Sequence, residues 1–167
     1  RRYWKEKRGL SDAAIRRFGL GYAPEDFGGL LHYLKRRGFS EEELETSGLI
    51  KRSAKGNLYD IFRHRVMVPI IDVRGAIIAF GGRVLDDSKP KYVNSPETLV
   101  YHKSDTVFAL QIAKRTKNRR YILCEGYMDV ISMHEAGFDT AVCACGTALT
   151  SEQAKMLSEY ADEVVLS

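Results

Sequence analysis

A glutamate at the end of a short apolar run is the first feature that could support chemistry. Tyr121–Cys124 is typical of a buried strand, and Glu125 and Gly126 follow it directly. In open α/β sheets, ligands gather at the carboxyl ends of the strands. A carboxylate there can hold a hard cation such as Mg²⁺, which prefers oxygen ligands. The alternative is that Glu125 only favours the positive end of the following helix.

Basic and aromatic side chains gather in a second region, between residues 81 and 103. Gly81-Gly82-Arg83 could bring backbone amides and a guanidinium to a phosphate, although a glycine pair after a strand can also be only a turn. Cations alternating with rings suit a single nucleic-acid strand, because the cations follow the backbone and the rings stack on bases. The residues in question are Arg83, Lys91, Tyr92, Asn94, Tyr101 and Lys103. The alternative is that they only belong to a solvated loop.

The elements before this region are predicted to be helical. Ser11 is a helix N-cap, and residues 28–37 predict a second helix with inward leucines at 30, 31 and 34. Ser40 with Glu43 forms a capping box that opens a third helix. The arginines of these helices are expected to be solvated.

The middle of the chain predicts a β-hairpin. Arg65–Ile71 and Ala76–Phe80 are strands around a turn at 72–75, and Gly81-Gly82-Arg83 follows the second strand. Residues 86–102 show little periodicity, which in a compact domain often marks a functional segment. Residues 106–115 predict a helix. The basic run Lys114–Arg120 after it is expected to be an exposed connection, with nucleic-acid contact as the alternative.

The last third alternates strands and helices. A helix at Tyr127–Glu135 is followed by a strand at Ala141–Ala144 and by a helix capped at Thr150, with Ala154 and Leu157 on its inner face. A third strand begins at Val164. Strand, helix, strand, helix, strand is the pattern of a parallel sheet, so we expect an α/β fold.

Composition is that of a globular domain. The 167 residues are 44% hydrophobic and 29% charged, with a net charge of +4 that permits a polyanionic partner. No apolar run approaches the roughly 20 residues of a membrane helix, and the start is unlike a signal peptide, so a cytoplasmic location is expected. The three cysteines, Cys124, Cys143 and Cys145, are expected to be buried and reduced.

Several ordered motifs together resemble the catalytic core of bacterial DnaG-type primases. Glu125-Gly126-Tyr127-Met128-Asp129-Val130 and Gly146-Thr147-Ala148-Leu149-Thr150 resemble the opening of its Toprim subdomain. The other motifs are Gly9-Leu10-Ser11, Phe18-Gly19-Leu20-Gly21-Tyr22-Ala23-Pro24, Arg63-His64-Arg65-Val66-Met67-Val68-Pro69-Ile70, Ala79-Phe80-Gly81-Gly82-Arg83, Pro90-Lys91-Tyr92-Val93-Asn94-Ser95-Pro96-Glu97-Thr98 and His102-Lys103.

The resemblance implies a DNA-directed RNA polymerase that lays short RNA primers on single-stranded DNA during replication. It implies a mixed α+β N-terminal subdomain at residues 1–118 and the first part of a Toprim parallel β/α sheet at residues 119–167. By motif, Glu125 is the catalytic glutamate that helps to hold Mg²⁺ or Mn²⁺. Template and nucleotide phosphates are expected at Arg83, Lys91, Tyr92, Asn94 and Lys103, with Tyr127 lining the nucleotide site.

The resemblance also implies substrates, protein partners and parts of the intact enzyme that these residues do not include. Ribonucleoside triphosphates are the substrates, and a replicative helicase and a single-strand binding protein would bind other parts of the intact enzyme. Zinc belongs to a separate N-terminal domain, whose Cys/His set this sequence lacks. The Toprim Asp-x-Asp pair is expected after the third strand, and the sequence ends at Ser167 before it. These 167 residues are therefore expected to be inactive alone.

Two rival functions stay open. Another Toprim protein, a topoisomerase or a nuclease, also places a glutamate after its first strand, but leaves the motif at residues 90–98 unexplained. A non-catalytic module that binds single-stranded DNA or docks a helicase would keep the basic residues without synthesis.

Overall fold

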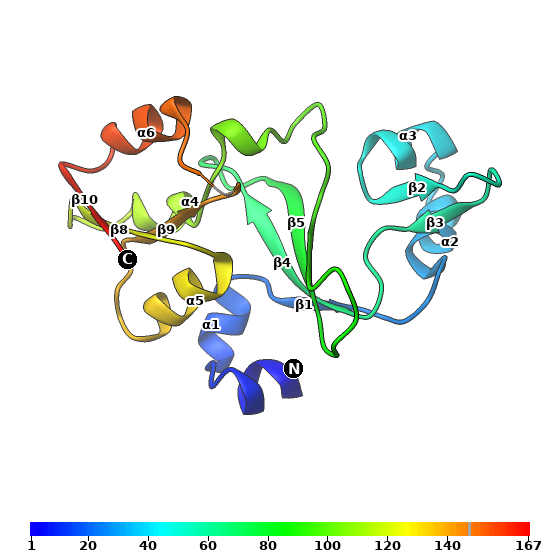
Figure 1. Ribbon diagram of the computed structural model, residues 1–167, viewed down its shortest axis with the longest axis horizontal. Helices are drawn as coiled ribbons and strands as arrows, with labels where there is room; N and C mark the ends of the chain where they lie inside the picture. Colours follow the sequence, from blue (N-terminus) through cyan, green and yellow to red (C-terminus); the bar gives the residue numbers. More distant parts are fainter. Residues whose placement is uncertain (147) are drawn as a thin grey trace. The chain divides into compact units, whose positions relative to one another are not determined.

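The chain forms two compact units in the computed structural model, which describes residues 1–146 and 148–167 (Figure 1). Unit 1 comprises residues 1–19, 69–78 and 101–167, and unit 2 comprises residues 20–68 and 79–100. The order of secondary structure shows that strands and helices are mixed along the whole chain, as expected for the α/β class. No described helix has the length and apolar character needed to cross a membrane.

Unit 2 contains a small helical layer with its own core. Helix α2 (Gly29–Arg36) and helix α3 (Glu41–Thr46) pack with a hairpin of β2 (Ile50–Arg52) and β3 (Leu58–Asp60). The predicted capping box of Ser40 and Glu43 is confirmed. The prediction for Leu30 was wrong: it is exposed, because α2 turns Leu31 and Leu34 toward the other elements. The core side chains are Leu31, Leu44 and Ile50, joined by Leu34, Leu49 and Leu58.

The larger sheet of unit 2 follows the predicted hairpin. Its strand order is β1-β4-β5-β6, and the pairs β1–β4 and β5–β6 are antiparallel. The strands are β1 (Gly21–Ala23), β4 (Arg65–Ile71), β5 (Ile77–Val84) and β6 (Tyr92–Asn94). Strands β4 and β5 continue beyond unit 2, so that their shared turn belongs to unit 1.

Strand β5 is longer than the sequence predicted. The segment Gly81-Gly82-Arg83 was expected to follow the strand, as a phosphate-binding segment or only as a turn, but it lies within β5 and pairs with β6. A side chain at Gly82 would place its Cβ 2.8 Å from Cδ1 of Phe62 and 3.0 Å from Cδ of Arg65. The glycine therefore lets two large side chains pack against the strand, which explains a residue that sequence patterns associate with turns.

Unit 1 contains the predicted parallel sheet. Its strand order is β10-β8-β9-β7, where β8 pairs in parallel with both β9 and β10, and β7 is antiparallel to β9. The strands are β7 (Val107–Phe108), β8 (Arg120–Cys124), β9 (Ala141–Ala144) and β10 (Glu163–Leu166). The helices are η1 (Tyr3–Lys7), α1 (Asp12–Arg17), η2 (Lys103–Asp105), α4 (Leu110–Ala113), α5 (Tyr127–Glu135) and α6 (Ser151–Ser158).

Two local predictions in unit 1 were wrong. Residues 106–115 form strand β7 and the short helix α4 instead of one helix, because Ala109 between them adopts a left-handed conformation with φ of 66°. Ala154 is exposed, and Gln153 takes the inward position on α6. The Gln153 side-chain amide donates to the carbonyl oxygens of Lys103 (2.7 Å) and Thr106 (2.9 Å), so a polar residue is satisfied within the core.

Other predictions in unit 1 are confirmed. The Ser11 hydroxyl accepts the amide of Ala14 at the start of α1, and Thr150 with Gln153 forms the capping box of α6. Helix α5 and strand β9 have the predicted limits. The three cysteines are buried and free. The predicted motif at residues 146–150 includes Thr147, which lies outside the described residues.

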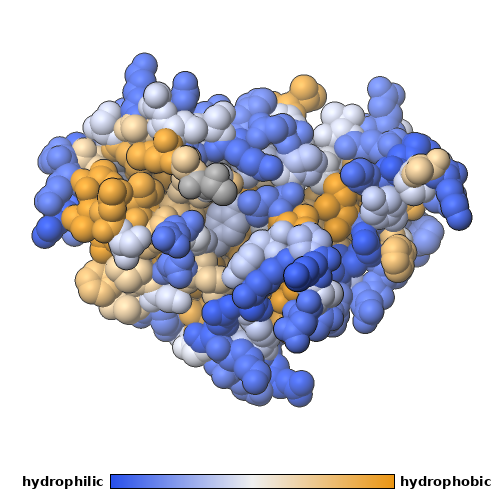
Figure 2. Space-filling view, viewed as in Figure 1, coloured by the Kyte–Doolittle hydropathy of each residue, from blue (hydrophilic) through white to orange (hydrophobic). Residues whose placement is uncertain are grey.

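Apolar side chains remain exposed on the edge strand β10. Figure 2 shows an apolar area over the part of unit 1 that holds β8 and β10, and Leu166 is 77% exposed. An edge strand with apolar side chains is a surface on which another segment can pair.

Gly82→Ala tests the packing of β5. The added methyl group has no room beside Phe62, so we expect a loss of about 1–3 kcal/mol in the free energy of unfolding, measured by urea denaturation. The control is Gly21→Ala in β1, where the new Cβ meets Met67 at an ordinary 3.8 Å. Equal stability of the two variants would contradict this account of the glycine pair.

Candidate functional site

Three of the predicted site residues lie on the β5–β6 ladder of unit 2, and a fourth, Lys91, directly precedes it. Arg83 pairs with Tyr92 across the two strands, and Asn94 pairs with Gly81 two residues further along. The Arg83 guanidinium lies 5.8 Å from the centre of the Tyr92 ring and donates to the carbonyl of Val84. Lys91 precedes β6 and is exposed, as is Tyr92. The structure therefore brings two cations, a ring and an amide together on neighbouring strands.

A buried arginine fixes the segment that carries Lys91. Arg65 is only 7% exposed, and its guanidinium donates to the carbonyls of Pro90 (2.8 Å), Lys91 (3.3 Å) and Gly82 (3.4 Å). Burial, and next the charge of Arg63, lower the pKa of Arg65. The three carbonyl oxygens offset part of the desolvation of the buried charge, which makes Arg65 a fixed support for residues 90–91.

The other three predicted residues belong to unit 1. Glu125 is exposed and directly follows β8, at the edge of the sheet where β9 also ends. Tyr127 opens α5, and its ring packs on Phe108 with centroids 4.8 Å apart. Burial, followed by the neighbouring Cys145 thiol, raises the pKa of Tyr127, so its hydroxyl stays protonated. Lys103 lies in η2, where its carbonyl accepts from Gln153.

The residues at Glu125 do not form a complete metal site. Among residues 1–146 and 148–167, no group of three or more His, Cys, Asp and Glu side chains is placed to hold a metal ion. Asp129 lies in the first turn of α5 and is also exposed, so the segment that follows β8 contributes the carboxylates of Glu125 and Asp129. A divalent cation in a protein site usually has several oxygen ligands, and these residues supply too few.

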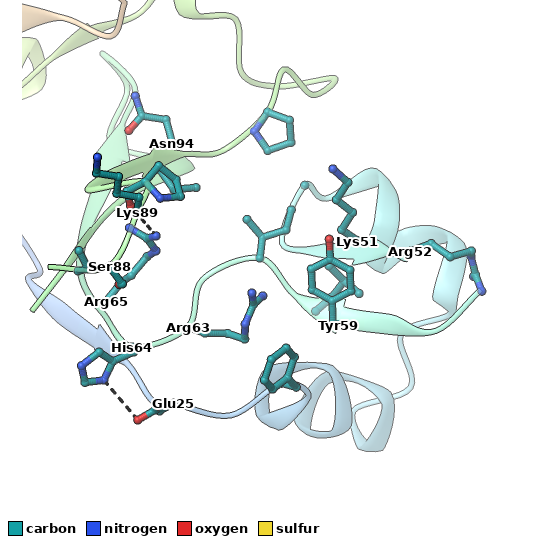
Figure 3. Close-up of a pocket in the computed structure, with 18 of the residues that line it drawn as sticks. Glu25, Lys51, Arg52, Tyr59, Arg63, His64, Arg65, Ser88, Lys89 and Asn94 are labelled. Atoms are coloured by element: carbon teal, nitrogen blue, oxygen red, sulfur yellow. Dashed lines mark hydrogen bonds and ion pairs between the residues drawn. The ribbon is translucent and has the colours of Figure 1, made fainter. Parts of the chain in front are cut away.

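Unit 2 also contains a cavity that the sequence analysis did not find. It has a volume of about 910 Å³ and draws its walls from α3, the β2–β3 hairpin and the segments around residues 25, 63 and 89 (Figure 3). Basic side chains from separate parts of the chain line it, namely Lys51, Arg52, Arg63, Arg65 and Lys89. Asn94, which was predicted from sequence, lies at its margin and connects it to the β5–β6 ladder.

Arg63 lies between two aromatic rings in this cavity. Its guanidinium is 4.7 Å from the centre of the Phe27 ring and 5.2 Å from that of Tyr59. It also donates a hydrogen bond to the carbonyl of Asp60. Phe27 remains 71% exposed despite this contact. A planar cation beside an exposed ring offers both a phosphate contact and a face on which a base can stack.

The charges around the cavity differ in how far they are neutralised. Arg52 is paired with Glu41 (3.1 Å) and Glu45 (2.7 Å), which raise its pKa. In the described part of the chain, by contrast, Lys51 and Lys89 form no ion pair. These two exposed lysines keep their charge available for an anion.

Asp60 holds the rings of the cavity in position. Its carboxylate accepts the backbone amides of Leu30 (2.8 Å) and Leu31 (2.9 Å), and so caps α2 in place of the missing side chain at Gly28. Its own amide donates to the carbonyl of Phe27 (2.9 Å). One buried carboxylate thus joins β3, which carries Tyr59, to the segment that carries Phe27.

Sequence reasoning missed this cavity because its parts are far apart in the chain. Phe27, Tyr59 and Arg63 come from three segments, and none of them forms a recognisable spacing with the others. A usable signal was present within seven positions, where two aromatic residues, Tyr59 and Phe62, come directly before two basic ones, Arg63 and Arg65.

Comparison with known proteins identifies the family. The chain matches the family model of the DNA primase catalytic core, N-terminal domain, over residues 1–114 and a Toprim-like model over residues 122–167. It is 49% identical to the DNA primase of Clostridium acetobutylicum over 96% of its own length. The chain belongs to the DnaG-type DNA primase family. The fold class and the resemblance expected from sequence are therefore confirmed.

Solved primase structures agree with this assignment. The structure of a DnaG primase catalytic domain bound to single-stranded DNA has a TM-score of 0.90 and 39% identity, and the match covers 99% of this chain and 54% of that one. The Aquifex aeolicus primase structure, with zinc-binding and RNA polymerase domains, has a TM-score of 0.87 and 38% identity, covering 96% and 40%. The chain spans 27% of the Clostridium primase.

Arg65→Met tests the support of the Lys91 segment. It removes the guanidinium bonds to the carbonyls of Gly82, Pro90 and Lys91, of which Lys91 keeps the Val84 amide, so we expect a loss of about 2–4 kcal/mol in the free energy of unfolding. Urea denaturation measures the loss. Arg36→Met at the exposed end of α2 is the control and should change stability by less than about 0.5 kcal/mol. A stable Arg65→Met protein would show that the carbonyl contacts do not hold residues 90–91.

Proposed function

We propose that this chain is the part of a primase core that holds the DNA template and the incoming nucleotide during synthesis of RNA primers. The observation that carries the proposal is the guanidinium of Arg63 between Phe27 and Tyr59 in a basic cavity. A relative of the same fold has been solved with single-stranded DNA, which supports a single strand as the occupant.

The template strand would follow the cavity of unit 2. Lys51 and Lys89 would contact backbone phosphates, because the described residues leave their charges without a counter-ion. The exposed ring of Phe27 would stack on a base, since every base offers a flat face whatever the sequence. Binding of this kind tolerates many sequences, as a template site must.

The nucleotide phosphates are assigned to the β5–β6 ladder. Arg83 and Lys91 would offset phosphate charge, with Tyr92 and Asn94 beside them on β6. In unit 1, Lys103 is assigned by motif to template or nucleotide phosphates, and Tyr127, at the start of α5, to the lining of a nucleotide site. The reaction would be nucleotidyl transfer, in which a 3′ oxygen attacks the α-phosphorus of a ribonucleoside triphosphate and pyrophosphate leaves.

Glu125 is assigned to the metal that this chemistry uses, Mg²⁺ or Mn²⁺. Such a cation stabilises charge on the reacting phosphate. The described residues do not complete its coordination. For the same reason, we propose that the 167 residues alone do not synthesise primers.

The remaining assignments concern the longer protein that the relatives represent. We propose the division into an N-terminal subdomain at residues 1–118 and a Toprim part at residues 119–167, close to the two matched ranges. Zinc would belong to a separate domain, as in the Aquifex aeolicus structure. Contacts with a replicative helicase and a single-strand binding protein, in the cytoplasm of a bacterium, would use other parts of that protein.

Binding of a single strand tests the cavity. We expect Phe27→Ala and Arg63→Ala each to weaken binding of a labelled 12-nucleotide dT strand about tenfold, because a stacked base contributes about 1–3 kcal/mol. Fluorescence anisotropy measures the affinity. The matched control is Arg37→Ala, which removes another cation–ring pair of unit 2, on Tyr33 and outside the cavity. An unchanged affinity for both cavity variants would rule out this template path.

Primer synthesis tests Glu125. A chimera would carry these 167 residues in place of the matching segment of the Clostridium acetobutylicum primase, and would be assayed on single-stranded DNA with Mg²⁺ or Mn²⁺. We expect labelled RNA from the chimera and a loss of at least about 100-fold with Glu125→Gln, because the neutral amide is a poor metal ligand. Glu152→Gln, at an exposed glutamate of α6, should keep full activity.

The other outcomes of this assay separate the rival functions. Normal synthesis by Glu125→Gln would remove Glu125 from the metal site. A folded chimera that binds DNA but makes no RNA would favour a non-catalytic binding module. Cleavage or relaxation of DNA without primers would favour another Toprim enzyme.

A further inference from the structure

Unit 1 has a cavity of its own, away from the end of β8. It has a volume of about 340 Å³ and is bounded by the end of α1, the turn between β4 and β5, and the segment that leaves α4. Its lining side chains include two exposed arginines, Arg17 and Arg115, with Thr116 beside the second. Neither arginine side chain has an ion pair or a hydrogen bond within the described parts of the chain.

The basic run at residues 114–120 divides into two groups. Arg119 pairs with Asp162 (2.9 Å) and Arg120 pairs with Glu163 (3.0 Å), which joins the start of β8 to the start of β10. Lys114, Arg115 and Lys117 are exposed, and the described residues offer them no carboxylate within ion-pair distance. Only the first half of the run therefore keeps its positive charge available for another molecule.

The base of the cavity is polar. Gln111 is only 7% exposed, and its side-chain oxygen has no hydrogen-bond partner among the described residues. This oxygen is an acceptor, so a water molecule can satisfy it but a phosphodiester, which also only accepts, cannot. The donors suited to a phosphate are the two guanidinium groups and the Thr116 hydroxyl.

The charge balance indicates a phosphodiester instead of a polyphosphate. Asp139 also lines the cavity, and its carboxylate would repel a chain of phosphates. Two arginines against one carboxylate leave a net charge of +1 among the lining side chains, which matches the single negative charge of one backbone phosphate. The lysines at 114 and 117 extend the positive surface beyond the cavity, as a continuous strand requires.

The lining also distinguishes a duplex from a single strand. All the described lining residues of this cavity are non-aromatic, and its apolar wall consists of Ile71 and Ile112. In the cavity of unit 2, by contrast, Phe27 and Tyr59 provide rings for unpaired bases. Contacts to phosphates are enough to position a duplex, because its bases are already paired and stacked and need no aromatic partner.

We propose that Arg17, Arg115 and Thr116 bind a backbone phosphate of double-stranded nucleic acid, with Lys114 and Lys117 on the flanking phosphates. This contact is additional to the template path of unit 2 and does not depend on it. A polymerase that makes a primer generates such a duplex, so the surface provides a place for the paired product or for DNA beside the template.

The test compares two DNA ligands with two pairs of substitutions in the 167-residue chain. We expect the double variant R17A/R115A to bind a labelled blunt 16-base-pair duplex about tenfold more weakly. The slope of log affinity against log salt should fall by about 1 for each arginine. Its affinity for the dT strand should be unchanged. The matched control, R119A/R120A, removes two paired arginines of the same basic run and should leave both affinities unchanged. Thermal unfolding followed by circular dichroism verifies that each variant is folded.

Three outcomes would count against the duplex proposal, and a fourth would count only against the template path. An unchanged duplex affinity and salt slope in folded R17A/R115A would overturn it. Equal losses for duplex and single strand would overturn the assignment to a duplex. Equal losses in R17A/R115A and R119A/R120A would show only a general effect of positive charge. Failure of the dT strand to bind any variant would count against the proposed template path and leave the duplex comparison valid.

Discussion

The carboxylate of Asp60 is the constraint on which the cavity of unit 2 depends. It replaces the missing cap of α2 by accepting two backbone amides, while the Asp60 amide binds the carbonyl of Phe27. The hydrogen bonds to a charged acceptor contribute about 1.5–3 kcal/mol each. They also set the spacing between the segment of Phe27 and the strand of Tyr59, so the two rings can lie on Arg63. The Asp60 side chain therefore both caps α2 and helps to position the rings of the cavity.

Three arginines that line the cavity of unit 2 show that neighbours decide what a guanidinium does. Arg52 is held by two glutamates, Arg65 is buried against carbonyl oxygens, and Arg63 lies between rings. The first two are committed to the fold because their donors are already used. Stacking leaves the edge of Arg63 able to donate, since a ring contacts only its face. Residue type alone could not separate these roles.

Predictions from the sequence succeeded where the interacting residues are close together in the chain, and failed where they are far apart. The capping boxes at Ser40 and Thr150 were predicted because both partners lie within one turn of helix. The strand end expected at Phe80, the helix expected across Ala109 and the inward position expected for Ala154 were wrong, because distant side chains or one backbone angle decided them. The roles of Glu125, Lys103 and Tyr127 came from motif resemblance and stay predictions, and the cavity at Arg63 escaped because its three parts meet only in the folded chain.

The segments of unit 1 impose an order on folding during synthesis. Unit 2 ends at residue 100, so all its strands are available before most of unit 1 has been made. Residues 1–19 leave the ribosome before unit 2 but belong to unit 1, where the amide and hydroxyl of Ser11 both donate to the carboxylate of Glu135. Helices η1 and α1 therefore meet their partners only after more than a hundred later residues have been made, while unit 2 can fold in the meantime. Until then, residues 1–19 stay open to proteases and chaperones at the ribosome.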